Sequence, residues 1–248
     1  MDFRFDIIYE YREMFWTGAK YTLGLTAFAV AVGTVLGLIG ALCRLANFEK
    51  GNIVLRALGW VLRTVSLLYV TLFRGTPLFV QIFIWHFIWS VALINPTDGW
   101  IISGELAREL RKEYGALIAG ALALSTNAGA YITEIFRAGI QSIDRGQVEA
   151  ARSLGFNYAQ AMRHAILPQA TRRMLPPFGN EFITLLKDSS LVSAIGVAEL
   201  AYVARTVSGR FSIYEEPYYA IALIYLVMTI GLAALFSWLE KRYRIGGR

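Results

Sequence analysis

The chain has 248 residues, of which 56% are hydrophobic and 17% charged, with a formal net charge of +6. Soluble domains average about 45–50% apolar and about 25% charged residues, so this composition excludes an ordinary cytosolic enzyme. The single cysteine, Cys43, excludes an intramolecular disulfide framework, and two distant histidines leave little for a metal site. No G-x-x-x-x-G-K-[ST] motif occurs, so the chain has no Walker A ATP site.

Residues 1–17 mix charged and aromatic side chains, with Phe3, Ile7, Ile8, Tyr11 and Phe15 at helical spacing. This pattern predicts a short amphipathic helix on the membrane surface, and a frayed terminus is the alternative. The segment lacks the basic start and small-residue end of a cleaved signal peptide.

A transmembrane domain is predicted over residues 18–240, and a basic tail over 241–248. The first uncharged run has 23 residues, enough to cross about 30 Å of hydrocarbon at about 1.5 Å per residue. The long apolar stretch near Arg74-Gly75-Thr76-Pro77 is counted as one broken crossing. The five predicted crossings are 21–43, 53–94 (broken), 115–136, 177–200 and 217–239.

Lysine and arginine set the predicted orientation, because they concentrate in cytoplasmic segments. Residues 137–173 hold six arginines, and the tail holds four basic residues. Residues 95–114 hold three basic and four acidic residues and are therefore placed outside. The N-terminus is then outside and the C-terminus cytoplasmic.

Small residues at Ala29, Gly33, Gly37 and Ala41 share one face of the first crossing. This spacing predicts close approach of another helix. The alternative is that glycine and alanine are simply frequent in membrane helices.

Residues 138–175 form a cytoplasmic loop too long for a mere connection. Asp144 with Gln147 has capping-box spacing, and Gly155 supplies a left-handed stop. Asn157 with Gln160 repeats the start signal, and Pro168 is expected to end the second helix. Such a hairpin is either a handle for another protein or an inert pair of interfacial helices.

Glu149-Ala150-Ala151-x-x-x-Gly155, followed by Ile166-Leu167-Pro168, resembles the EAA loop of ABC-importer permeases. Further blocks are similar to the polar amino-acid branch of that family, the binding-protein-dependent transport permeases, and the resemblance runs from about residue 16 to the tail. These blocks are Phe73-Arg74-Gly75-Thr76-Pro77-Leu78, Tyr131-Ile132-Thr133-Glu134-Ile135-Phe136-Arg137, Leu167-Pro168-Gln169-Ala170, Asn180-Glu181-Phe182 and Leu186-Lys187-Asp188-Ser189-Ser190-Leu191.

The resemblance implies an all-α integral membrane protein with five transmembrane helices in the type I ABC-importer permease fold. Glu149, Ala150, Ala151 and Gly155 would contact a separate ATPase subunit, present in two copies, which binds the ATP and magnesium that this chain lacks. The other implied partners are a second permease copy or a related permease, an extracytoplasmic amino-acid-binding protein and the lipid bilayer, with no nucleic acid. The implied location is the bacterial cytoplasmic (inner) membrane.

Ionisable groups at bilayer depth cost roughly 2.5–3.5 kcal/mol each, so they are functional candidates. Glu181, Thr184 and Asp188 fall on one helical face, with Lys187 rotated by about 120°. Lys187 or Arg74 would bind the carboxylate of an amino acid, and Asp188 or Glu181 its ammonium group. The full predicted substrate set is Glu181, Thr184, Lys187, Asp188, Ser189, Arg74, Gly75 and Thr76.

Structural alternatives remain for these groups. Lys187 and Asp188 would form an ion pair that holds the bundle, and the break after Arg74 would be a kink only. Glu134 and Glu199 lie near span ends and would simply reach water, and His86 receives no role.

The predicted function is the transmembrane subunit of an ATP-driven importer of a polar amino acid, with a slight preference for basic ones, working by alternating access. The alternative is a self-sufficient ion- or proton-coupled transporter that uses Glu181 and Asp188. A membrane enzyme is disfavoured because the chain has no nucleophile–base or metal constellation.

Overall fold

The computed structural model describes residues 4–46 and 51–243, and its regular elements are helical. Phe3 and the tail residues 244–248, which entered the predictions above, lie outside these ranges. The elements are α1 (Phe5–Glu10), α2 (Arg12–Leu45), α3 (Ile53–Gly75), α4 (Leu78–Ile84), the π-helical η1 (Trp85–Trp89), α5 (Ser90–Leu93), α6 (Gly104–Gln141), α7 (Arg145–Ser153), α8 (Tyr158–Ala161), the π-helical η2 (Met162–Ile166), α9 (Leu167–Asp188), the 3₁₀-helical η3 (Ser189–Ile195), α10 (Leu200–Phe211) and α11 (Glu215–Tyr243).

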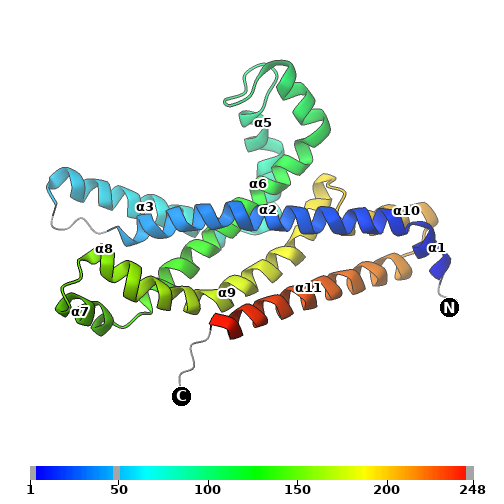
Figure 1. Ribbon diagram of the computed structural model, residues 1–248. Helices are drawn as coiled ribbons and strands as arrows, with labels where there is room; N and C mark the ends of the chain where they lie inside the picture. The colour runs from blue at the N-terminus through cyan, green and yellow to red at the C-terminus, as the bar shows by residue number, and fades with distance from the viewer. Residues whose placement is uncertain (1–3, 47–50, 244–248) are drawn as a thin grey trace.

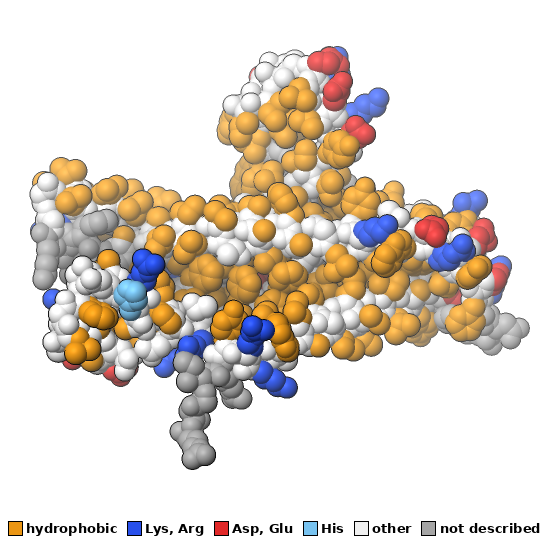
Figure 2. Space-filling view, viewed as in Figure 1, with side chains coloured by type: hydrophobic (Ala, Val, Ile, Leu, Met, Phe, Trp, Pro, Cys, Tyr) orange, Lys and Arg blue, Asp and Glu red, His pale blue; other side chains and the backbone are white. Residues whose placement is uncertain are grey.

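Within the described residues, four helices are long and apolar enough to cross a membrane: α2, α3, α6 and α11. The helix from Tyr158 to Ile195, together with α10, forms a fifth candidate span that is bent by 48°. Hydrophobic side chains cover the middle of the molecule, and charged ones gather mainly towards its ends (Figure 2). The prediction of an all-α membrane protein is confirmed by these helices.

Helix α2 crosses α6, and the two run in the same direction (Figure 1). Ala29, Gly33, Gly37 and Ala41 are all buried. A Cβ added to Gly33 would lie 3.0 Å from the Ala128 Cβ, and one added to Gly37 would lie 2.6 Å from the Ile132 Cγ2. The predicted close approach is therefore present, and its partner is α6.

The helix break at Gly75-Thr76-Pro77 falls within the predicted broken crossing. Thr76 is extended, with φ −119° and ψ 148°, because a residue that precedes proline disfavours the helical region. The following apolar helix, Leu78–Leu93, is shorter than a full span. This helix, which comprises α4, η1 and α5, projects together with the first turns of α6 away from the layer of α2, α9 and α11 (Figure 1).

Pro168 does not end the second loop helix, so that prediction is wrong. The helical rod continues from α8 through η2 into α9, where Pro168 occupies the first turn. In the first turn of a helix the backbone N–H has no intrahelical acceptor, so proline, which lacks that N–H, is tolerated there. The wider π turn at η2 absorbs the local change in the backbone hydrogen-bond pattern.

The bent span has two features that the sequence did not predict. Helix α9 ends at Asp188, and the 3₁₀ turn η3 and Gly196 follow within the predicted crossing 177–200. Glu199 does not reach water: it is fully buried and caps α10. Its carboxylate accepts hydrogen bonds from the Tyr202 backbone N–H at 2.9 Å and the Tyr225 hydroxyl at 2.7 Å.

The N-terminal segment is helical and packed, which excludes the frayed alternative for its described residues. Ile7 and Phe15 are buried in a cluster with Leu200 and Val203 of α10. The Arg4 backbone N–H also donates to Glu216 of α11 at 3.0 Å. The surface location of this segment stays a prediction.

Candidate functional site

A groove of about 590 Å³ opens where the end of α3, the second half of α6 and the middle of α9 meet. Polar and charged side chains come into it from all three helices. Its lining residues are Arg74, Tyr131, Glu134, Ile135, Ala138, Gly139, Ser142, Arg173, Pro177, Asn180, Glu181 and Thr184.

Arg74 enters the groove from the last turn of α3. Its guanidinium carbon lies 5.0 Å from the centre of the Tyr131 ring, within the range of a cation–π contact. A cation–π contact uses the face of the guanidinium and leaves its N–H groups able to donate hydrogen bonds. Arg74 is exposed and therefore places at the groove a positive charge that can bind an anionic group.

Glu134 is engaged by protein cations. One carboxylate oxygen lies 3.3 Å from a guanidinium nitrogen of Arg44 on α2, and the other lies 2.6 Å from one of Arg137 on α6. Its side chain is 18% exposed, so Glu134 does not simply extend into water as expected. Two arginines compensate its charge, which leaves Glu181 as the acidic group of the groove without such a pair.

The α9 wall follows helical spacing. Pro177, Glu181 and Thr184 recur at intervals of four and three residues, which puts them on one face. In the part of the chain that the structure describes, Glu181 makes no ion pair within 4 Å. The groove thus combines a carboxylate and a hydroxyl from α9 with a guanidinium from α3.

The other predicted substrate residues do not line this groove. Lys187 is exposed, Asp188 is half-buried, and Ser189 is buried with its hydroxyl donating to the Leu186 carbonyl at 2.7 Å. Lys187 and Asp188 are both described and are not within ion-pair distance of 4 Å. Gly75 and Thr76 lie at the helix break, next to Arg74 but outside the lining.

Several lining residues received no role from the sequence. Tyr131 and Asn180 stand inside the blocks that carried the family resemblance, so that signal was available. Arg173 and Ser142 were not signalled: they meet only because the α6 end and α9 come together, where the Arg173 guanidinium donates to the Ser142 carbonyl.

The α7 loop is built much as the spacing predicts. Gly155 has φ +85°, the left-handed conformation of a helix stop. Asn157 and Gln160 form the predicted capping box, with both hydrogen bonds at 2.9 Å. Asp144 also caps α7, but it accepts from the Gly146 backbone N–H at 2.6 Å, so the box predicted with Gln147 is wrong.

The EAA residues divide between two faces of α7. Ala151 is buried within the chain, whereas Glu149 and Ala150 are exposed. Leu154 and Tyr158 flank Gly155 and are 78% and 72% exposed. An apolar surface therefore lies beside the exposed EAA residues, at the end of the molecule opposite α1 and α10 (Figure 1).

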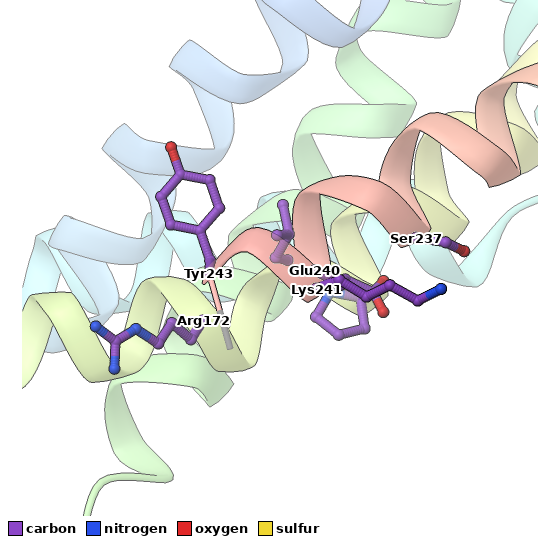
Figure 3. Close-up of a pocket in the computed structure, with 7 residues that line it drawn as sticks. Arg172, Ser237, Glu240, Lys241 and Tyr243 are labelled. Atoms are coloured by element: carbon purple, nitrogen blue, oxygen red, sulfur yellow. The ribbon is translucent and has the colours of Figure 1, made fainter. Parts of the chain in front are cut away.

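A second cavity, of about 460 Å³, lies between the start of α9 and the end of α11. Figure 3 shows Arg172 and Lys241 pointing to opposite sides of it, with Glu240 and Ser237 near Lys241. These charged groups do not converge on one point. The groove at Arg74 and Glu181 is therefore the candidate site.

Comparison with known proteins decides the family. Residues 33–245 match the binding-protein-dependent transport system inner membrane component family. The chain belongs to this family. That confirms the resemblance read from the EAA loop and the blocks around it.

Relatives in this family match the chain over nearly its whole length. The probable glutamine ABC transporter permease protein GlnM of Bacillus subtilis is 36% identical over 236 residues, which cover 95% of this chain and 96% of that protein. The arginine transport system permease protein ArgU of Corynebacterium glutamicum is 36% identical over 232 residues, 93% of this chain and 68% of that protein.

A solved structure shares the fold. It is the crystal structure of an amino acid ABC transporter with histidines, and one of its chains is 38% identical, with a TM-score of 0.75. The match covers 98% of this chain and 99% of that one. The present chain is thus a membrane-embedded permease with the ABC-importer permease fold.

Proposed function

We propose that this chain is the transmembrane subunit of an ATP-driven importer that moves a polar amino acid by alternating access. The observation that carries the proposal is the groove in which Arg74 and Glu181 enter from different helices. A free amino acid is a zwitterion, so its carboxylate matches the guanidinium and its ammonium group matches the carboxylate. Thr184 and Asn180 supply hydrogen bonds for a polar side chain.

A preference for a basic amino acid would need two acidic groups, one for each cationic end of the substrate. Asp188 is not among the groove residues. Glu134 lines the groove but is paired with Arg44 and Arg137. The glutamine and arginine permeases among the relatives define the two substrates to compare.

The partners in this proposal follow from the α7 loop and the family. Glu149, Ala150 and Gly155, with exposed Leu154 beside them, would form the contact with a separate ATPase, and buried Ala151 would set the depth of α7 against this chain. Two ATPase subunits would bind ATP and magnesium. A second permease copy or a related permease would complete the path, and an extracytoplasmic binding protein would deliver the substrate.

The proposed location is the bacterial cytoplasmic (inner) membrane, with the N-terminus outside and the C-terminus cytoplasmic. This orientation places the arginine-rich residues 137–173 on the cytoplasmic side. A reporter fused after Arg248 should therefore read cytoplasmic, and one fused at the N-terminus external.

Uptake by the complete importer in proteoliposomes tests the proposal. Radiolabelled glutamine and arginine should enter only when ATP is present on the side of the membrane where the ATPase subunits lie. Vanadate should stop uptake, and a protonophore should not. Uptake that needs a proton gradient and ignores nucleotide would establish the secondary-transporter alternative instead.

A pair of variants locates the site. Glu181→Gln should lower uptake per ATP hydrolysed about tenfold, because it removes the groove carboxylate that has no ion-pair partner. Asp188→Asn, seven residues further along α9 and outside the groove, is the matched control and should lower it less than threefold. The reverse order would move the site to the end of α9.

A further inference from the structure

The break between α3 and α4 is held by side-chain hydrogen bonds. A helix leaves its last four carbonyl groups without intrahelical partners, and Pro77 has no N–H to offer them. In a membrane protein such groups must find partners inside the protein. Three side chains provide them here: those of Thr76, Gln81 and Asn127.

Gln81 lies one turn into α4 and is only 3% exposed. Its side-chain nitrogen donates to the Phe73 carbonyl at 2.8 Å, the Thr76 carbonyl at 3.0 Å and the Thr76 hydroxyl oxygen at 2.8 Å. The Thr76 hydroxyl in turn donates to the Leu72 carbonyl at 2.8 Å. One amide thus ties both sides of the break together.

Asn127 joins this arrangement from α6 and is 6% exposed. Its side-chain nitrogen donates to the Phe73 carbonyl at 3.2 Å and to the Gln81 side-chain oxygen at 3.0 Å. A second tier meets at Thr126: the Tyr69 hydroxyl donates to its carbonyl at 2.7 Å, and the Trp85 indole N–H donates to its hydroxyl at 3.1 Å. Both helices that flank the break are therefore fixed against the same turn of α6.

This clamp of Gln81 and Asn127 adjoins the place where Arg74 lies. The Phe73 carbonyl, which receives both amides, belongs to the residue directly before Arg74. On α6, Tyr131 follows Asn127 by four residues and so lies on the same face one turn later. Asn127 of the clamp and Tyr131 under the guanidinium therefore lie on consecutive turns of one face of α6.

We propose that Gln81 and Asn127 are positioning residues that lock the α3–α4 break and thereby hold Arg74 over Tyr131 in the groove. They do not touch the substrate. They fix the angle between α3 and α4, so that the two helix ends move together with α6. This inference rests on the proposed function, because only the proposed function gives Arg74 a substrate to bind.

The test uses the purified complex of permease and ATPase subunits, without nucleotide and without the binding protein, and measures the dissociation constants of radiolabelled glutamine and arginine. Gln81→Leu keeps approximate size but removes the amide, and it should weaken binding of the transported amino acid about tenfold while basal ATPase stays within twofold. Asn127→Ala should weaken it about threefold, because Gln81 keeps its bonds to Phe73 and Thr76. Ser125→Ala is the control, since that buried hydroxyl donates to a carbonyl of its own helix, that of Ala121, at 2.6 Å.

A double-mutant cycle separates positioning from general loosening of the fold. Arg74→Ala with Gln81→Leu should bind no more weakly than Arg74→Ala alone, because the clamp acts through Arg74. Additive losses, or unchanged binding in Gln81→Leu when Arg74→Ala is weakened, would overturn the proposal.

Hydrogen exchange at the amides of Gln81–Ile84, which are the hydrogen-bonded amides at the start of α4, gives a readout that does not depend on substrate. Exchange there should rise at least tenfold in Gln81→Leu and in Asn127→Ala, and unchanged exchange would overturn the clamp itself. Binding that is unchanged in Arg74→Ala, with faster exchange in Gln81→Leu, would instead refute the proposed site and the positioning role while leaving the clamp as a structural lock.

Discussion

The two sides of α6 differ in what they offer. The side towards α2 carries Ala128 and Ile132, packed against Gly33 and Gly37 so closely that a methyl group has no room. The side towards α9 carries Tyr131 and an ion-paired Glu134 and borders a groove of about 590 Å³. One helix thus supplies a closely packed contact and a polar wall, and we infer that the first fixes the position of the second.

Adding side-chain atoms to the close contact between α2 and α6 should have the largest effect. Gly37→Leu would force side-chain atoms into Ile132, and overpacking of this kind costs typically about 1–3 kcal/mol or more. We expect a large loss of assembled importer in the membrane and a lower melting temperature for what remains. Gly24→Leu is the control on the same helix, because a Cβ there meets nothing within 4 Å; equal losses in both variants would contradict the packing argument.

A glycine can also be required for its backbone alone, as Gly155 shows. No atom lies within 4 Å of a Cβ added there, but φ is +85°. Gly155→Val should strain the loop by roughly 1–2 kcal/mol, because a branched residue disfavours the left-handed region. We expect substrate-stimulated ATP hydrolysis to fall at least tenfold while the chain still inserts.

Gly155→Asn separates conformation from contact, because asparagine tolerates left-handed backbone. It should retain more than a third of the stimulated hydrolysis. Full coupling in Gly155→Val would remove the α7 loop from the coupling path.

The smallest effect is expected at the boundary between the two sides of α6. Glu134→Gln leaves Arg44 and Arg137 without their shared carboxylate, and partly exposed pairs contribute about 1 kcal/mol. The melting temperature of the complex should fall by about 2–4 °C. A calorimetric scan that shows no change would mean that these arginines find other partners.

The sequence predicted the parts of this molecule that depend on local pattern. Apolar runs predicted the spans, small residues at intervals of four predicted the face that meets α6, and Gly155 with Asn157 predicted the turn after α7. Each of these is a property of neighbours along one helix or turn, so one segment contains all the information.

What the sequence did not predict depends on partners far along the chain. Nothing near Glu134 reveals that Arg44 lies beside it, and nothing near Glu199 reveals the Tyr225 hydroxyl. Likewise, Pro168 looks like a helix end until the π turn before it is seen. Asp188 shares a helical stripe with Glu181, yet it lies beyond the groove lining, which extends along α9 only as far as Thr184.

Thiol labelling tests the central claim, that the groove between α6 and α9 is the solute path, most directly. In a Cys43→Ala background, Thr184→Cys should react with a water-soluble maleimide in the complete importer, and the transported amino acid should slow that reaction at least threefold. Ser125→Cys, buried beside α2, should stay unlabelled with or without substrate. A Thr184→Cys thiol that is as inert as the one at position 125, or that reacts at the same rate when substrate is bound, would contradict the account.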